Sequence, residues 1–160
     1  MILLVTTRPG REGDAILELE WALEKVRVKG TDWRGVLLAE TPLSKEEALD
    51  RLRNFETQAI QRVVPLDELV PAKPEEIEKA VLELGERIDG TFAVRAKVRG
   101  NRGLSQRKLE VELGSLLVER YGLKVNLGEP DYLVLVEVLG KRAGIGVLRR
   151  NEVLRFEVVD

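Results

Sequence analysis

The chain lacks both cysteine and histidine, and it has only one methionine and few aromatic residues. Without cysteine it can form no disulfide, thiolate nucleophile or zinc–thiolate site, and without histidine it lacks the commonest general base and metal ligand. Much catalytic chemistry is thereby excluded. We therefore expect no catalytic residue, no bound metal and no cofactor.

Long apolar runs are absent as well. No segment approaches the roughly 20 apolar residues of a membrane span, and the apolar residues 1–5 run into Thr6 without the flanks of a signal peptide. We expect a folded, cytoplasmic protein of one or two domains with no membrane contact. The 34% charged residues, single methionine and missing cysteine follow the composition trend of hyperthermophile proteins, which predicts a thermophilic source.

Basic residues are unevenly distributed along the chain, whose net charge is -2. Residues 92–109 (FAVRAKVRGNRGLSQRKL) contain six cations and no carboxylate, and residues 141–150 add four more cations. That leaves 16 basic against 28 acidic residues elsewhere. A positive field of this kind attracts phosphates, so the pattern predicts a polyanionic partner. The alternative is an ordinary solvated polar face.

The first basic segment alternates as a half-buried strand does. The predicted core face consists of Val94, Ala96 and Val98. The opposite face carries Arg95, Lys97 and Arg99. Ser105 then fits a helix N-cap, which places Arg107 and Lys108 in the first helical turn, where the helix dipole disfavours cations. A local rule broken at one place suggests function there.

The turn at residues 100–103 (GNRG) resembles the GxxG clamp of KH RNA-binding domains. A KH clamp joins two helices, whereas this turn joins a strand to a helix, which argues against a KH domain. A glycine-rich turn before a helix still allows a phosphate to approach the helix amides, and Arg107 and Lys108 would complete such an anion site.

The first 70 residues read as a βαββαβ unit, the ferredoxin-like pattern. The expected elements are a strand at 2–6, a helix at 13–25, a hairpin of 26–30 and 36–40, a helix opened by the capping box at 44–47, and a strand at 60–64. Trp21 is expected in the core. Trp33, in the hairpin turn, could instead stack on a base.

Prolines at 65, 71 and 74 predict a domain boundary, which gives an N-terminal domain at 1–70 and a second domain at 71–160. Its expected elements are helices at 74–88 and 105–121 and strands at 92–99, 124–127, 132–138, 144–149 and 154–159. The fold class is thus α/β (α+β). Asp131 fits either a general base or turn chemistry before a strand, and the glycines of 140–146 fit a hairpin turn.

Several segments together resemble a THUMP domain across most of residues 75–150: FAVRAKVRG, SQRKLEVELG, LLVERYGLKVNLGEPDYLVLVEV and AGIGV. The preceding GREGDAILELEWAL, RGVLLAET and ETQAIQRVVPLDELV are similar to the ferredoxin-like region of stand-alone archaeal THUMP proteins resembling the tRNA cytidine-acetylation adaptor. The resemblance implies that the chain binds tRNA near its acceptor end while another domain or protein performs the chemistry.

By this resemblance the RNA surface would comprise Arg95, Lys97, Arg99, Arg102, Ser105, Arg107 and Lys108. The expected function is a tRNA-binding adaptor that presents tRNA to a separate RNA cytidine acetyltransferase, which forms N4-acetylcytidine from acetyl-CoA. No DNA partner is expected, and the chain leaves no room for a catalytic domain. The alternatives are a small RNA-modifying enzyme, a THUMP subunit of a different tRNA modification enzyme, and a scaffold whose basic face binds acidic protein.

Overall fold

The structure is a computed structural model that describes residues 1–156. The chain divides into two compact units, one of residues 1–65 with the segment that begins at Asn151, and one of Leu66–Arg150. Each unit has its own hydrophobic core. None of the helices in residues 1–156 has the length and apolar character needed to cross a membrane.

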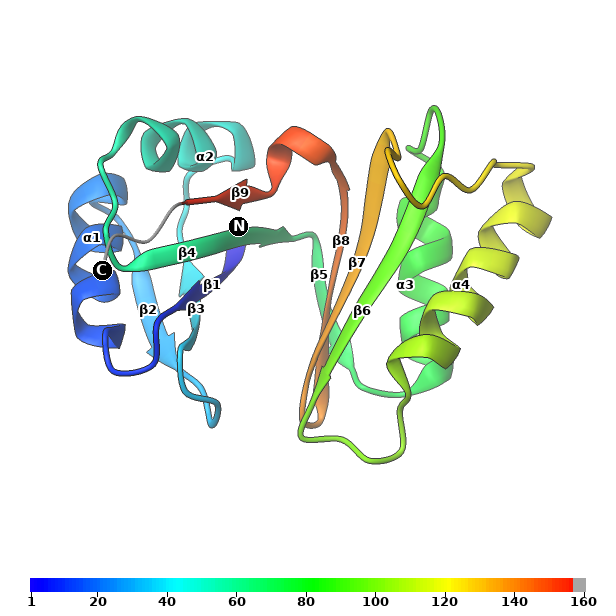
Figure 1. Cartoon of the computed structure of the whole chain (residues 1–160), viewed down its shortest axis with the longest axis horizontal. Helices are drawn as coiled ribbons and strands as arrows, with labels where there is room; N and C mark the ends of the chain where they lie inside the picture. Colours follow the sequence, from blue (N-terminus) through cyan, green and yellow to red (C-terminus); the bar gives the residue numbers. More distant parts are fainter. Residues whose placement is uncertain (157–160) are drawn as a thin grey trace. The chain divides into compact units, whose positions relative to one another are not determined.

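The first unit is a five-stranded sheet with two helices (Figure 1). Its elements are β1 (Ile2–Thr7), α1 (Glu12–Leu23), β2 (Arg27–Gly30), β3 (Val36–Glu40), α2 (Lys45–Asn54), β4 (Ile60–Leu66) and β9 (Leu154–Arg155). The strand order is β2-β3-β1-β4-β9. The predicted βαββαβ order is confirmed, and α1 and α2 pack against each other and bury their apolar sides with those of the sheet.

Helix α2 begins where the capping box predicts, because the Ser44 hydroxyl accepts a hydrogen bond from the Glu47 amide at 3.2 Å. Helix α1 differs from its prediction. Its core face is made by Ala15, Leu19, Ala22 and Leu23, so Trp21 lies on the opposite side and is 69% exposed. The expectation that Trp21 packs in the core was wrong. Trp33 is half-buried in the β2–β3 turn.

The second unit is a four-stranded sheet covered on one face by two helices (Figure 1). Its elements are β5 (Glu68–Pro71), α3 (Pro74–Gly85), β6 (Phe92–Arg99), α4 (Gln106–Tyr121), β7 (Tyr132–Leu139) and β8 (Arg142–Arg149), followed by a short 3-10 helix, η1 (Arg150–Glu152). The strand order is β5-β8-β7-β6. Strand β7 is internal, which fits its mostly apolar sequence, and β6 lies at an edge.

Three segments differ from the sequence-based expectation. Residues 68–71, at the predicted domain boundary, form β5 and pair with β8, with Leu69 opposite Gly144. Residues 124–127 make only a single bridge, between Val125 and Phe92, instead of a strand. Strand β9 pairs with β4 of the first unit, so the segment from Asn151 lies with that unit and not with the predicted second domain of 71–160. Residues 157–159 of the expected last strand fall outside the described part.

Helix α4 sets the position of the basic segment. Ser105 is its N-cap, and its side chain accepts a hydrogen bond from the Lys108 amide at 3.3 Å. Gly122 ends the helix in the left-handed conformation with φ of 66°, which suits a residue without a Cβ. Leu109, Leu113 and Leu117 bury the inner face of the helix. Both predicted ends of the helix are confirmed to within one residue.

Candidate nucleic-acid interface

The basic strand β6 has the two faces that its alternation predicted. Val94 and Ala96 are buried against the helices, whereas Arg95 and Lys97 are exposed. Because β6 is an edge strand, these two cations lie on the outermost strand of the sheet. Arg95 is partly fixed, since its guanidinium donates a hydrogen bond to the Leu127 carbonyl at 3.1 Å.

Arg99, the third cation of the strand, has a different environment. Its guanidinium lies 2.9 Å from the Glu137 carboxylate on β7, and the two side chains are only 10% and 3% exposed. Glu137 is the single charged residue of strand β7, where a buried carboxylate requires a compensating cation. Arg99 thus stabilises the fold, and we leave it out of the proposed RNA surface.

The side chain of Asn101 stabilises the connection between β6 and α4. Gly100 has φ of 64°, so the chain turns there through a conformation that favours glycine. The Asn101 amide group donates to the Gly140 carbonyl at 3.0 Å, and its carbonyl oxygen accepts from the Gly103 amide at 2.9 Å. The Gly103 amide is therefore occupied within the turn, while Arg102 is exposed.

The tertiary structure adds two cations to this turn. The hydrogen bond from Asn101 brings the β7–β8 turn, with Lys141 and Arg142, beside the β6–α4 connection. Both residues are exposed. Arg149 lies at the other end of β8, about 23 Å away at a rise of about 3.3 Å per residue. The second basic segment of the sequence is thus divided between two places.

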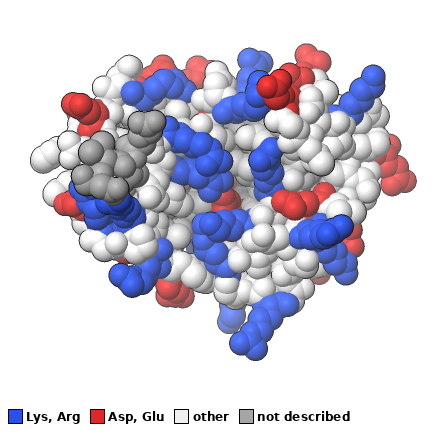
Figure 2. Space-filling view, viewed as in Figure 1, with Lys and Arg blue, Asp and Glu red and all other residues white. Residues whose placement is uncertain are grey.

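Basic side chains reach the surface of the second unit with carboxylates dispersed among them (Figure 2). On α4, Lys108 lies 3.9 Å from Glu112 one turn away, an exposed pair worth a few tenths of a kcal/mol. Arg107 is also exposed, and the first turn of α4 contains no acidic residue. The helix dipole therefore opposes both cations at this end.

We expect Arg107→Gln to raise the free energy of unfolding by roughly 0.3 to 1 kcal/mol, because it removes a cation from the positive end of the dipole. Arg120→Gln is the matched control: it removes a cation from the last turn of the same helix and should lower stability. Chemical denaturation of both variants checks the opposite signs. A loss of stability in Arg107→Gln would show that Arg107 has a structural role.

The open edge of β6 is largely covered by groups of its own unit. The Glu110 carboxylate accepts from the Ala96 amide at 3.0 Å, and the Gln106 side chain accepts from the Val98 amide at 3.1 Å. The Phe92 amide donates to the Lys124 carbonyl at 3.0 Å. Side chains from α4 thus replace a neighbouring strand and protect the edge from non-specific pairing. Within the described residues, the edge-facing amide of Val94 has no hydrogen bond.

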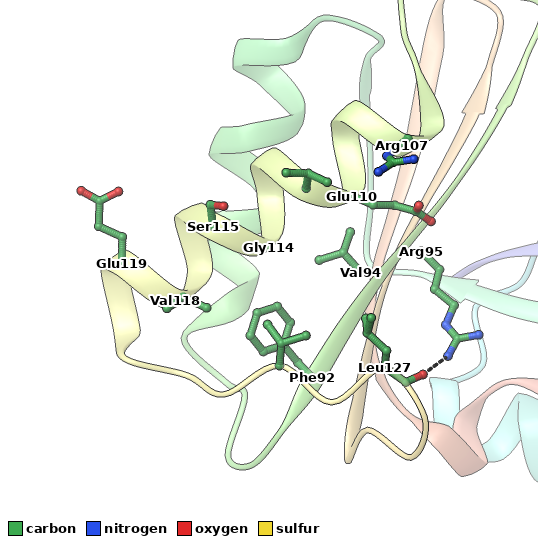
Figure 3. Close-up of a pocket in the computed structure, with 12 residues that line it drawn as sticks. Phe92, Val94, Arg95, Arg107, Glu110, Gly114, Ser115, Val118, Glu119 and Leu127 are labelled. Carbon is green, nitrogen blue, oxygen red and sulfur yellow. Dashed lines mark hydrogen bonds between the residues drawn. The ribbon is translucent and has the colours of Figure 1, made fainter.

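A groove of about 930 Å³ opens at Val94, between α4, β6 and the segment after α4 (Figure 3). Its wall carries four exposed apolar side chains: Val111, Val118, Val125 and Leu127, at 59%, 41%, 50% and 74%. Arg95 and Arg107 also line the groove. This groove was not predicted from the sequence. The available signal was valine at positions 111 and 118, two turns apart on the helix face opposite its leucines.

Asp131 stabilises the turn before β7 through hydrogen bonds with Thr91. Its carboxylate accepts from the Thr91 amide at 2.9 Å and the Thr91 hydroxyl at 3.0 Å, while its own amide donates to that hydroxyl at 3.1 Å. The Thr91 amide, followed by the Thr91 hydroxyl, lowers the pKa of Asp131 below its usual value. These bonds fix the entry to β7. Among residues 1–156, no three acidic side chains converge as a metal site would require.

A lowered carboxyl pKa makes stability dependent on pH. The stabilising effect of Asp131 is present above the pKa of an unfolded aspartate and is lost as the pH falls through the lowered folded pKa. We therefore expect Asp131→Asn to lower the melting temperature at pH 7 and to have a smaller effect at about pH 2. Asp50→Asn is the control at another exposed site. An equal loss for Asp131→Asn at both pH values would contradict the assignment.

The segment that carries this candidate interface matches a known domain. Residues 71–148 match the sequence model of the THUMP domain. This segment is a THUMP domain. It contains the basic strand, α4, the groove and the β7–β8 turn, so the candidate interface is a feature of the THUMP domain itself. The resemblance noted in the sequence is confirmed at the level of the domain.

The chain is similar to one known protein in sequence and to others in fold. Over 67 residues, the chain is 45% identical to the probable tRNA sulfurtransferase of Aeropyrum pernix, an alignment covering 41% of this chain and 17% of that protein. The fold of this chain resembles that of TrmN from Thermus thermophilus, with a TM-score of 0.70 and 24% identity. The match covers 91% of this chain and 44% of TrmN. The fold also resembles a 4-thiouridine synthetase solved with RNA and ATP (TM-score 0.65, 23% identity, 92% and 41%). The chain thus spans less than half of each relative.

Proposed function

We propose that this chain is a tRNA-binding adaptor that presents a cytidine of tRNA to a separate N4-acetyltransferase, which uses acetyl-CoA in the cytoplasm. The observation that carries the proposal is the group of exposed cations at the β6–α4 connection of a THUMP domain, beside an open apolar groove. The cations are Arg102, Arg107 and Lys108, with Lys97 on the strand and Lys141 and Arg142 on the adjacent turn.

The two parts of the interface suit different parts of an RNA. Exposed cations bind phosphates regardless of sequence and give most of the affinity. The groove offers apolar side chains and the Val94 amide, which suit an unpaired base that has left the stack. A tRNA acceptor end offers both, because its unpaired nucleotides follow directly on a duplex. We therefore assign the duplex phosphates to the cations and an unpaired nucleotide to the groove.

We assign the chemistry to the partner because, within residues 1–156, the two carboxylates whose pKa is shifted are hydrogen-bonded to the backbone. The pKa of Glu12 is lowered by hydrogen bonds from its own amide and that of Gly35, and the pKa of Asp131 is lowered by Thr91. A general base near neutral pH requires a raised carboxyl pKa. The lowered pKa values keep both carboxyl groups ionised near neutral pH. The runner-up, an RNA-modifying enzyme, would need acid–base groups elsewhere in the chain.

A second candidate function is supported by the Aeropyrum pernix relative. The same THUMP surface would then present tRNA to a sulfur-transferring enzyme. The proposed role of the chain is unchanged in this case, and only the identity of the partner and the modified nucleotide differs.

A reconstitution assay tests the adaptor role. We expect purified chain with tRNA and acetyl-CoA to yield no modified nucleotide, and addition of the acetyltransferase from the same cell to yield N4-acetylcytidine, detected by mass spectrometry of digested tRNA. The acetyltransferase without the chain is the control and should be much less active. Acetylcytidine formed by the chain alone would refute the adaptor role. Thiolated nucleotide, obtained only with the sulfurtransferase of that cell, would favour the second candidate.

A further inference from the structure

The ferredoxin-like unit exposes an apolar patch that its own core does not use. Leu17 and Trp21 lie one turn apart on α1 and are 48% and 69% exposed. The buried side of this helix consists of alanine and leucine side chains. In the part of the chain that the structure describes, the other large exposed apolar side chains are the four of the groove, on the THUMP domain. Leu17 and Trp21 thus form a separate surface.

Three exposed acidic residues lie along the helix that presents this patch. Helical spacing places Asp14 and Glu20 beside Leu17, and Glu24 follows at the C-cap of the helix. Asp14 lies 3.2 Å from Arg11, and Glu24 lies 4.0 Å from Arg51, so their charges are partly compensated at the edge of the patch. These carboxylates disfavour a phosphodiester backbone. They favour a partner that carries lysine or arginine.

Glu18, between these two apolar residues, does not belong to the free surface. Its carboxylate accepts hydrogen bonds from the amides of Gln58, Ala59 and Ile60, at 2.6, 3.0 and 3.2 Å. These bonds join α1 to the start of β4. The helix that presents the patch is therefore fixed by both its buried face and Glu18, which allows an exposed tryptophan to act as a rigid anchor.

We propose that Leu17 and Trp21, with their acidic rim, are the docking surface for the modification enzyme that the adaptor serves. This inference rests on the proposed function. The complementary surface on the enzyme is an apolar pocket for the indole, bordered by basic side chains. An adaptor must hold RNA and protein at once, and surfaces of opposite charge select different partners. Two apolar side chains make a small contact, which suits a complex that forms and dissociates at each delivery.

The test measures binding of the full-length chain to the acetyltransferase, without RNA, by isothermal titration calorimetry. We expect Trp21→Ser to weaken this complex about 30-fold or more, as loss of a central aromatic anchor does, and Trp21→Phe to restore part of the affinity. Glu20→Lys combined with Glu24→Lys should weaken it and reduce its salt dependence. Val111→Ser, which removes an exposed apolar side chain from the groove, should weaken tRNA binding instead. Melting temperatures verify that each variant is folded.

Each result decides the docking proposal. Unchanged enzyme affinity in Trp21→Ser would overturn it and leave the adaptor role intact. If the unaltered chain binds tRNA but not the acetyltransferase, both the docking proposal and the acetylation role fail. A loss of tRNA affinity in Trp21→Ser would make the patch an RNA contact. A dimer of the unaltered chain that becomes monomeric in Trp21→Ser would make the patch a contact between copies of the chain, and would also overturn the proposal.

Discussion

Replacing Arg99 with glutamate is expected to lower the free energy of unfolding by about 3 kcal/mol or more. The substitution would place a second carboxylate beside Glu137, in a site where the present side chains are only 10% and 3% exposed. A buried charge that loses one partner keeps its desolvation cost with less compensation. Urea denaturation followed by circular dichroism measures the change.

Lys29→Glu provides the control. It reverses the same charge at an exposed strand position of the other unit, away from Glu137, and surface substitutions of this kind change stability by about 0.5 kcal/mol or less. The exchange of both partners, Arg99→Glu with Glu137→Arg, should recover part of the loss. Equal stabilities for Arg99→Glu and Lys29→Glu would show that the ion pair has no structural importance, and Arg99 would return to the candidate RNA surface.

The second large effect concerns tRNA binding. Simultaneous replacement of Arg102, Arg107 and Lys108 with alanine should weaken tRNA binding about 100-fold at moderate salt. If each cation contacts one phosphate, the slope of log affinity against log salt concentration should decrease by about 2 to 3. Titrations at several salt concentrations, by fluorescence anisotropy of labelled tRNA, measure both quantities.

A control with the same change in net charge is available in the other unit. Replacement of Lys25, Arg27 and Lys29 with alanine removes three exposed cations at and before β2. If tRNA responds only to overall charge, both triple variants should lose affinity equally. A local interface on the THUMP domain requires the β6–α4 variant to lose far more. Equal losses would reject this location while leaving the THUMP assignment unaffected.

Patterns between residues close in sequence were predicted well. The alternation of β6, the Ser105 cap and the Gly122 stop of α4, and the capping box of α2 depend on contacts within one strand or one helical turn, and the structure has all of them. The THUMP resemblance also came from local runs in a fixed order, and the family match at residues 71–148 confirms it. The specific RNA residues and the adaptor role stay predictions.

The sequence alone therefore determined most of the helices and strands, the caps of α2 and α4 and the location of the basic segment, because each follows from the properties of neighbouring residues. The tertiary structure alone decided which residues from distant segments meet. It pairs Arg99 with Glu137, 38 residues apart, and it joins β9 to β4. It also leaves Trp21 outside the core and opens the groove beside α4. Such contacts depend on strand order and on which helix face is covered, and local propensities specify neither.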